Sequence, residues 1–275
     1  MSEDDDVVGS WTLDDATRLR IRTERIEGAI GERDWHTAII EAEELLDDSP
    51  DNTQALLRLA DATLEIPDAE GAAQAYEQYL RRVSDPEPRS LAGLAVARFE
   101  LCELMGCIEV AREALRRDPE QPTASYYLSL ALERTDGPGP ESQAAFEVAH
   151  TLDPTSFPRP ISLADDQWTR VVEEAAAQLH PTLRAFWSGV PLHLGDLPEL
   201  ELLRKSDPPI TPTVTALYEG SPPEGDATES RPTRLVLYRR NLRRVGTIEG
   251  VTREVHRALE GEALHWLGWT ADDLP

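Results

Sequence analysis

The sequence predicts two units of different fold class, an all-α stack of helix pairs followed by a small α+β domain. Prolines that end apolar segments recur with spacings of 36, 33 and 35 residues, at Pro50, Pro86, Pro119 and Pro154. This recurrence stops at a proline-rich segment, residues 157–160, and three short β-rich runs follow. A period of about 34 residues is typical of helical solenoids, whereas a helix, three strands and a helix are typical of an α+β domain.

Each recurring proline is predicted to end the second helix of a pair, because proline cannot continue a helix and restricts the residue before it. The pattern breaks again at residues 31–34, 66–68, 105–106 and 136–140, which predicts antiparallel helices of about fourteen residues each. The alternative is a nonrepetitive helical bundle, against which the agreement of three successive spacings argues. Small residues on the second helices allow close helix packing: Ala38, Ala42, Ala111, Ala114, Ala145 and Ala149.

These segments resemble four tetratricopeptide repeats over residues 17–157. The resemblance implies a stack in which each helix pair needs its neighbours to bury its apolar face, and a concave surface that binds a protein or peptide partner. Because this half contains no lysine, a ligand that ends in a carboxylate would depend on arginines such as Arg58, Arg98 or Arg134. Residues 1–16 are predicted to be an acidic, disordered tail.

The charge of the chain limits its partners. With 52 acidic and 27 basic residues, the formal net charge is -25, of which -19 lies before residue 161. Nucleic acid and anionic membranes would be repelled, so we expect neither, whereas a basic protein or peptide fits. No apolar run approaches the ~18 residues that span a bilayer, and the acidic start lacks the features of a signal peptide. We therefore expect a cytoplasmic protein in which Cys102 and Cys107 are buried free thiols.

The second unit, residues 161–275, begins with a helix from a capping box of Ser162 and Asp165 to about Gln178. Strands are predicted at 190–194, 214–218 and 234–238, with Pro- and Gly-rich loops at 206–212 and 220–232. A final helix begins near Thr247. Its apolar side is predicted to carry Ile248, Val251, Val255, Leu259 and Leu267.

Three segments of this unit occur in a specific order. Thr-Ala-Leu-Tyr-Glu-Gly-Ser-Pro begins at Thr215, Pro-Thr-Arg-Leu-Val-Leu-Tyr-Arg-Arg-Asn-Leu begins at Pro232, and Gly-Glu-Ala-Leu-His-Trp-Leu-Gly-Trp begins at Gly261. Together they resemble the minimal zincin-like metallopeptidase family, whose last helix carries an extended H-E-x-x-H motif. The resemblance implies a small zinc hydrolase domain.

The resemblance also implies residue roles, and it shows where the motif is incomplete. Glu262 stands at the general-base position and His265 at the second metal-ligand position. Gly261 replaces the first histidine, and Ala271 replaces the third ligand, with Asp272 one residue late. A catalytic zinc needs three protein ligands and an open position for water. Zinc held only by the remaining residues would be bound weakly, so the motif is degenerate.

Two other histidines are weak substitutes for the missing ligand. His256 lies nine residues before His265, which at 100° per residue puts it on the opposite face of the helix. His193 lies on a predicted strand and would reach the site only if the fold placed it there. Gly268 is expected to end the helix, and the tryptophans Trp266 and Trp269 are expected to fill the core or an inter-unit contact.

The first predicted function is a tetratricopeptide-repeat adaptor joined to a zincin-like pseudoenzyme that acts as a binding module. The alternatives are an active zinc metallopeptidase that recruits Asp272 or His193, and a pure scaffold. A plainer interpretation treats Glu262 as a solvated helix residue and His265 as a packed histidine. The arginine pairs at 239–240 and 243–244 are predicted to bind acidic side chains of the repeat half.

Overall fold

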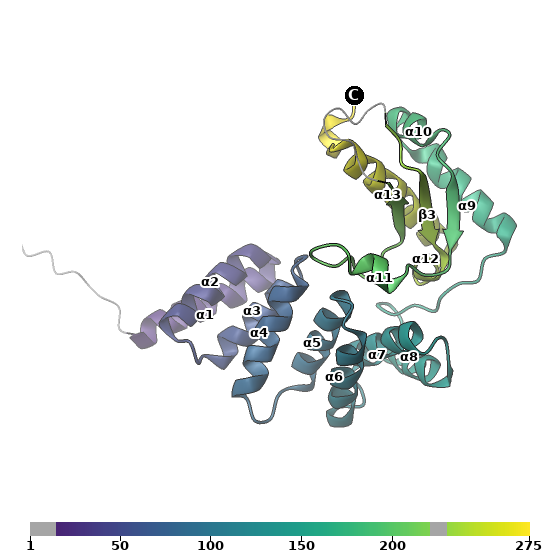
Figure 1. The fold of residues 1–275 in the computed structure, drawn as a ribbon. Helices are drawn as coiled ribbons and strands as arrows, with labels where there is room; N and C mark the ends of the chain where they lie inside the picture. The colour runs from purple at the N-terminus through teal and green to yellow at the C-terminus, as the bar shows by residue number, and fades with distance from the viewer. Residues whose placement is uncertain (1–14, 221–229) are drawn as a thin grey trace, which may run out of the picture.

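The computed structural model describes residues 15–220 and 230–275, and it shows a helical stack joined to a smaller α+β unit (Figure 1). The predicted fold class is thereby confirmed. Most of the predicted tail and the middle of the predicted loop at 220–232 lie outside the described residues. No helix in the described part of the chain is long and apolar enough to cross a membrane.

Four helix pairs form the stack within residues 15–152. The first helix begins at Asp15, two residues before the predicted start of the repeats. The pairs are α1 (Asp15–Glu32) with α2 (Trp35–Asp48), α3 (Thr53–Leu64) with α4 (Ala69–Arg82), α5 (Pro88–Glu100) with α6 (Leu104–Arg117), and α7 (Pro122–Thr135) with α8 (Pro140–Leu152).

Local sequence explains most of the helix boundaries. The side chains of Asp34, Asn52 and Asp68 accept hydrogen bonds from backbone N–H groups in the first turns of α2, α3 and α4, which satisfies donors that have no partner within the helix. Helices α5, α7 and α8 begin with proline, whose fixed φ suits a first turn. All four recurring prolines follow the end of a second helix, as predicted.

One predicted helix break is wrong. Met105 and Gly106 lie inside α6, and the chain turns between Leu101 and Glu103 instead. Cys102 adopts a left-handed φ of 60° at this turn, a conformation usually taken by glycine or asparagine. Gly106 therefore does not mark the break between α5 and α6, which lies at Cys102.

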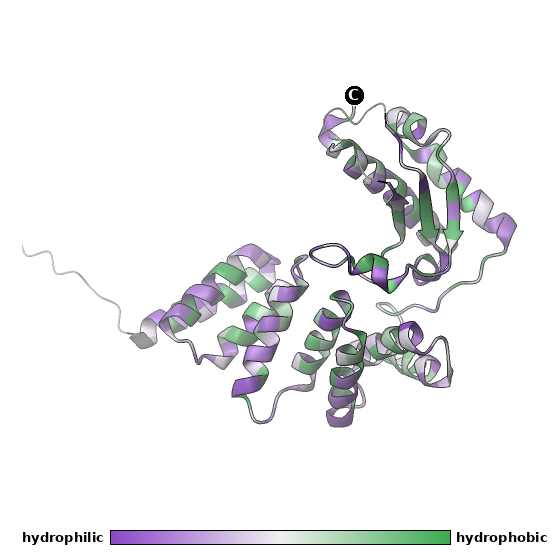
Figure 2. Cartoon of the chain, viewed as in Figure 1, coloured by the Kyte–Doolittle hydropathy of each residue, from purple (hydrophilic) through white to green (hydrophobic). Residues whose placement is uncertain are grey.

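Alanines allow the helices of the stack to pack closely. The predicted small residues Ala38, Ala42, Ala111, Ala114 and Ala149 are fully buried, and Ala145 is 9% exposed. Larger side chains such as Leu57, Tyr76 and Phe99 fill the space between successive pairs. Figure 2 shows the resulting alternation of hydrophobic and hydrophilic stripes along the helices.

The second unit contains a three-stranded sheet with helices packed against it. Its strands have the order β1-β3-β2, with β1 parallel and β2 antiparallel to β3. The elements are α9 (Asp165–Gln178), α10 (Pro181–Trp187), β1 (Leu192–Gly195), α11 (Leu200–Leu203), β2 (Ala216–Glu219), β3 (Arg234–Tyr238), α12 (Arg239–Arg243), α13 (Ile248–Leu267) and the 3-10 helix η2 (Ala271–Asp273).

The core of this unit lies between α9, α13 and one face of the sheet. Leu235 and Leu237 on β3 are fully buried together with Val251 and Val255 of α13 and Trp168 of α9. Successive strand residues point to opposite faces, so Val236 lies on the other face. Of the predicted apolar side of the last helix, Ile248 is 43% exposed and Leu267 is only partly buried.

The predicted capping box at the start of α9 is also wrong. The residue before the helix is Ala164, and its backbone N–H donates to the side-chain oxygen of Gln167 at 2.8 Å. Ser162 lies outside the helix, and Asp165 is its first residue. A glutamine at the third helical position therefore accepts the N–H of the residue before the helix, the role that the predicted box gave to Asp165.

A carboxylate of the stack holds the two units together. Glu133 of α7 accepts a hydrogen bond from Arg240 at 2.8 Å and a second from Arg244. Both Glu133 and Arg244 are largely buried, with side chains 17% and 14% exposed. The predicted pairing of arginines with the acidic half is thus confirmed for these two, whereas Arg239 and Arg243 contact groups of the second unit.

A second contact joins the segment around α11 to the turn between α5 and α6. Leu200 packs against the apolar cluster of the last two helix pairs, and Arg204 donates to the carbonyl oxygen of Cys102 at 2.6 Å. The thiol of Cys102 in turn lies 3.6 Å from the carbonyl oxygen of Ile210. Figure 1 shows α11 between the stack and the sheet.

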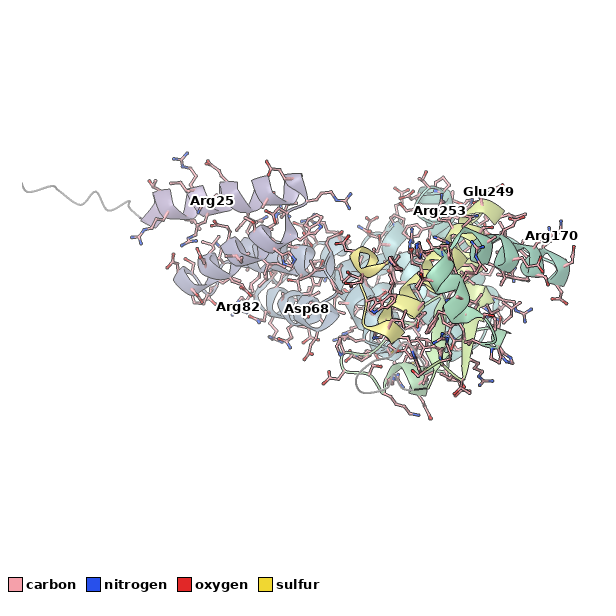
Figure 3. The ribbon with its side chains drawn as sticks, turned by 90° about the horizontal axis from the view of Figure 1, so that it is seen from above. Arg25, Asp68, Arg82, Arg170, Glu249 and Arg253 are labelled. Carbon is pink, nitrogen blue, oxygen red and sulfur yellow. The ribbon has the colours of Figure 1, made fainter. Side chains whose placement is uncertain are left out.

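Charged side chains cover the outer surface of both units. Figure 3 shows Arg25, Asp68 and Arg82 on the stack and Arg170 and Arg253 on the second unit, and all five are exposed. Exposed ion pairs contribute little to stability. The contact at Glu133 differs because its partners are largely removed from water.

We predict that Glu133→Gln weakens the junction between the units. The substitution leaves Arg240 and Arg244 partly buried without their shared carboxylate, which should cost about 2 kcal/mol of unfolding free energy. Differential scanning calorimetry should show a lower or split unfolding transition. Glu113→Gln is the control, because Glu113 pairs with Arg116 of its own helix at the surface; equal effects of the two substitutions would contradict the prediction.

Candidate functional site

Helix α13 carries the residues of the incomplete motif and has well-defined ends. The hydroxyl of Thr247 accepts a hydrogen bond from the N–H of Gly250 at 3.0 Å and caps the first turn. Gly268 ends the helix with a left-handed φ of 65°, as glycine commonly does. The predicted start and end of this helix are both confirmed.

Glu262 is partly buried where α13 passes the edge strand β2. Its carboxyl group accepts a hydrogen bond from the backbone N–H of Tyr218. Burial raises the pKa of Glu262 to about 7, against the opposing effect of that hydrogen bond. Glu262 is therefore not an ordinary solvated helix residue.

The hydrogen bond to Tyr218 lies on the free edge of the sheet. The carbonyl of Thr215 accepts from the N–H of Tyr238, so Thr215 points its backbone groups toward β3. In an antiparallel pair these directions alternate along the strand, and Tyr218 consequently points its N–H and C=O away from β3. Glu262 thus meets a backbone donor on the edge of the sheet.

His265 lies beside the same tyrosine, at the surface of the helix. Its ring centroid is 5.7 Å from that of Tyr218, and the residue is exposed. Trp266 is 3% exposed, meets the Tyr218 ring edge-on at 5.0 Å and donates to the hydroxyl of Ser230 at 3.1 Å. Trp266 therefore fills the core, as predicted, while His265 is available to solvent.

Gly261 lies four residues before His265, on the same face of the helix. It is exposed, and a Cβ atom built on it would meet no other atom within 4 Å. A side chain could therefore stand at this position without displacing its surroundings. The absence of an imidazole here is a property of the sequence and is not forced by the packing.

The other proposed ligands lie elsewhere. The Nδ1 atom of His256 is 3.3 Å from the carbonyl oxygen of Ala175 in α9, in accord with its predicted position away from His265. His193 lies on β1, which β3 separates from β2, and it shares the face of Val236 opposite the helices. Asp272 is an exposed residue of η2.

These residues do not provide the donor set of a zinc site. Among residues 15–220 and 230–275, no group of three or more His, Cys, Asp or Glu side chains is close enough together to hold a metal ion. Zinc requires three protein ligands in a catalytic site, whereas the face of α13 that carries the motif offers one imidazole, His265, and one carboxylate, Glu262. The residues present therefore do not fit the metal.

Two family models match the chain in the order predicted from the sequence. The tetratricopeptide repeat model matches residues 25–87, and the zincin-like metallopeptidase model matches residues 187–275. The chain thus combines a tetratricopeptide-repeat half with a zincin-like metallopeptidase-family domain. No curated protein sequence matches it.

Several solved structures resemble the stack. A crystal structure of MamA is 18% identical and covers 51% of this chain and 75% of its own, with a TM-score of 0.46. A second MamA crystal structure is also 18% identical and covers 47% and 75%, with a TM-score of 0.43. A mutant of Thermobaculum terrenum O-GlcNAc transferase is 19% identical and covers 67% of this chain and 32% of its own, with a TM-score of 0.44.

Sequence reasoning did not identify Tyr218 as part of the site. Its ring contacts both His265 and Trp266, and its N–H binds Glu262. The tyrosine belongs to the strand segment that resembles the family, but nothing in its spacing indicated which helix residue it meets. Only the packing of α13 along the strand edge brings the two together.

We predict that Glu262 makes stability depend on pH. Because its folded pKa of about 7 lies above the unfolded value of about 4.3, the folded state binds a proton that the unfolded state lacks between these values. The resulting stabilisation is complete below pH ~4.3 and is lost as the pH rises to 7.

Partial exposure limits this contribution to about 2 kcal/mol. Urea unfolding across this pH range should therefore show a decline for the wild type that is absent in Glu262→Gln. Glu249→Gln, at an exposed position of the same helix, should retain the wild-type profile. A decline of the same size in Glu262→Gln would show that another group is responsible.

Proposed function

We propose that the protein is a tetratricopeptide-repeat adaptor whose zincin-like domain binds a partner and does not hydrolyse it. The units of this proposal are residues 17–157 and 161–275. The observation that carries it is the pair of positions one helical turn apart on α13, where His265 is exposed and Gly261 has open space in place of an imidazole.

The chemistry of Glu262 supports this proposal. A general base must be able to reach the proton that it removes, whereas the Glu262 carboxyl accepts the N–H of Tyr218 in the wall of the site. The same contact joins the helix to the strand edge. Glu262 therefore acts in the proposal as a structural acceptor, and zinc, if it binds at His265 and Asp272, is held weakly.

The proposed partner of the repeat half is a protein or peptide, and the charge favours a basic one. Repeat stacks bind partners along an extended inner surface. The arginines on the first helices do not create a general anion surface, because Arg58 binds Glu27 at 2.6 Å and Arg98 binds Glu77 at 3.1 Å. A net charge of -25 attracts basic segments at moderate ionic strength.

Restoring the missing imidazole tests the proposal. We predict that Gly261→His raises zinc affinity at least ~10-fold over the wild type, which corresponds to about 1.4 kcal/mol, because histidines four residues apart share a helix face. Isothermal titration calorimetry with zinc measures the change. Gly261→Ala is the matched control, since it adds a side chain without a metal donor.

The wild type is expected to lose zinc on desalting and to leave unstructured peptides uncleaved. About one retained equivalent of zinc together with cleavage that a chelator stops would show an active metallopeptidase and would overturn the proposal. Unchanged zinc affinity in Gly261→His would indicate that this face of α13 does not adopt a metal-site geometry.

A further inference from the structure

The last helix of the stack, α8, presents a row of uncharged, mostly apolar side chains to solvent. Ala144, Val148, Thr151 and Leu152 are all exposed, and the exposed fractions of Val148 and Leu152 are 41% and 39%. Residues at these spacings lie on one face of a helix, and we call them the α8 stripe. Figure 1 shows α8 at the opposite end of the stack from α1. Single exposed apolar residues are ordinary, but a row of them requires an explanation.

The other second helices of the stack carry polar side chains at the same places. Leu152 is the last residue of α8, and the other members of the stripe lie one, four and eight residues before it. The same count from the ends of the other second helices gives Asp48, Asp47, Glu44 and Ile40 in α2, Arg82, Arg81, Gln78 and Gln74 in α4, and Arg117, Arg116, Glu113 and Glu109 in α6. All of these except Ile40 are charged or carry an amide. Helix α8 therefore lacks the polar outer face that its counterparts have.

The position of α8 at the end of the stack does not explain the stripe. Helix α6 shares an apolar cluster with α7 through Cys107, Ile108 and Ala111, which lie ten, nine and six residues before the last residue of α6. At 100° per residue, these positions lie on the opposite side of the helix from the positions of the stripe. A further repeat stacked on α8 would therefore leave the stripe exposed.

A hollow of about 290 Å³ lies beside the stripe. It is lined by α8 and by the turn between α6 and α7, through Glu147, Val148, Thr151, Leu152, Pro119 and Glu120. The hollow thus combines apolar side chains with two carboxylates. An apolar side chain of a partner could enter it and leave little of its own surface in water.

The charge around the hollow favours a basic partner. Glu147 is bound by Arg159 at 2.6 Å, whereas Glu120 is exposed and forms no ion pair in the described part of the chain. Among the described residues that line the hollow, none is basic. The half of the chain that contains it carries a net charge of -19. A second copy would bring the same charge, which opposes pairing, while a basic partner would be attracted.

We propose that the outer face of α8 binds a basic amphipathic helix of a partner protein. Apolar side chains three or four residues apart on that helix would cover the stripe and fill the hollow, which is a common way for a helix to bind an apolar groove. A lysine or arginine beside them would meet Glu120, and the small Ala144 would let the two helices approach closely. The inference rests on the proposed adaptor role and gives the adaptor a second binding surface, separate from the inner surface of the stack and from α13.

The test uses a peptide of leucine and lysine of about 18 residues, or five helical turns, with its leucines on one helical face. The matched compound has the same composition in an order that gives no apolar face. Isothermal titration calorimetry on the full chain should show at least ~10-fold tighter binding of the amphipathic peptide, because only that peptide offers an apolar face to the stripe.

A substitution in the stripe separates docking from general attraction between charges. Val148→Glu gives α8 the acid that α6 carries as Glu113, and it should weaken binding of the amphipathic peptide at least ~10-fold, because it places a charge in an apolar contact. General attraction of a basic peptide would instead increase with the added negative charge. Ile40→Glu is the matched control, since Ile40 is an exposed apolar residue at a corresponding place on α2, and it should bind as the wild type does.

Leu152→Ser is a second variant, which removes an apolar side chain without adding charge and serves if Val148→Glu does not fold. Equal binding of the two peptides, wild-type binding by the stripe variants, or an equal loss in Ile40→Glu would overturn the proposal. Analytical ultracentrifugation tests the other occupant: a dimer of the wild type that Val148→Glu dissociates would assign the stripe to a second copy and would also overturn it. Zinc binding by Gly261→His is measured on α13, so the proposed function and this inference can fail separately.

Discussion

The arrangement of the protein depends on a shared carboxylate. Glu133 projects from the last repeat and binds Arg240 in the short helix after β3 and Arg244 directly after that helix. Because the three side chains are largely withdrawn from water, their geometry constrains the second unit more than an exposed ion pair would. The contact therefore fixes how the second unit is oriented on the stack. The Nε and Nη2 atoms of Arg134 have no partner among the described residues.

In the zincin-like domain, helix α13 and the edge strand β2 bring an aromatic residue, a carboxyl group and an imidazole together. Helix α13 still lies along the edge strand β2, and Tyr218 contacts Glu262, His265 and Trp266. Glu262 now closes a hydrogen bond between helix and strand. A partly buried carboxyl that accepts a backbone N–H thus joins the helix to the strand edge.

Much of the architecture followed from local sequence signals. The recurring prolines, the capping residues Asp34, Asn52 and Asp68, and the left-handed Gly268 act within one or two turns of chain, so their consequences could be predicted. Two local predictions were wrong. The turn between α5 and α6 lies at Cys102 and not at Gly106. The side chain of Gln167, and not that of Ser162, accepts a backbone N–H at the start of α9.

The sequence by itself determined the two units, their order, the repeat period and the missing histidine at residue 261, because these depend on periodicity and on side-chain identity. Only the tertiary structure decided that His193 and His265 lie on opposite sides of the sheet, that Glu262 meets Tyr218, and that the Nε and Nη2 atoms of Arg134 have no acceptor among the described residues. Each of these depends on which groups distant in the chain become neighbours. The acidic chain contains many carboxylates, and the fold determines which of them lies close enough to each arginine to form an ion pair.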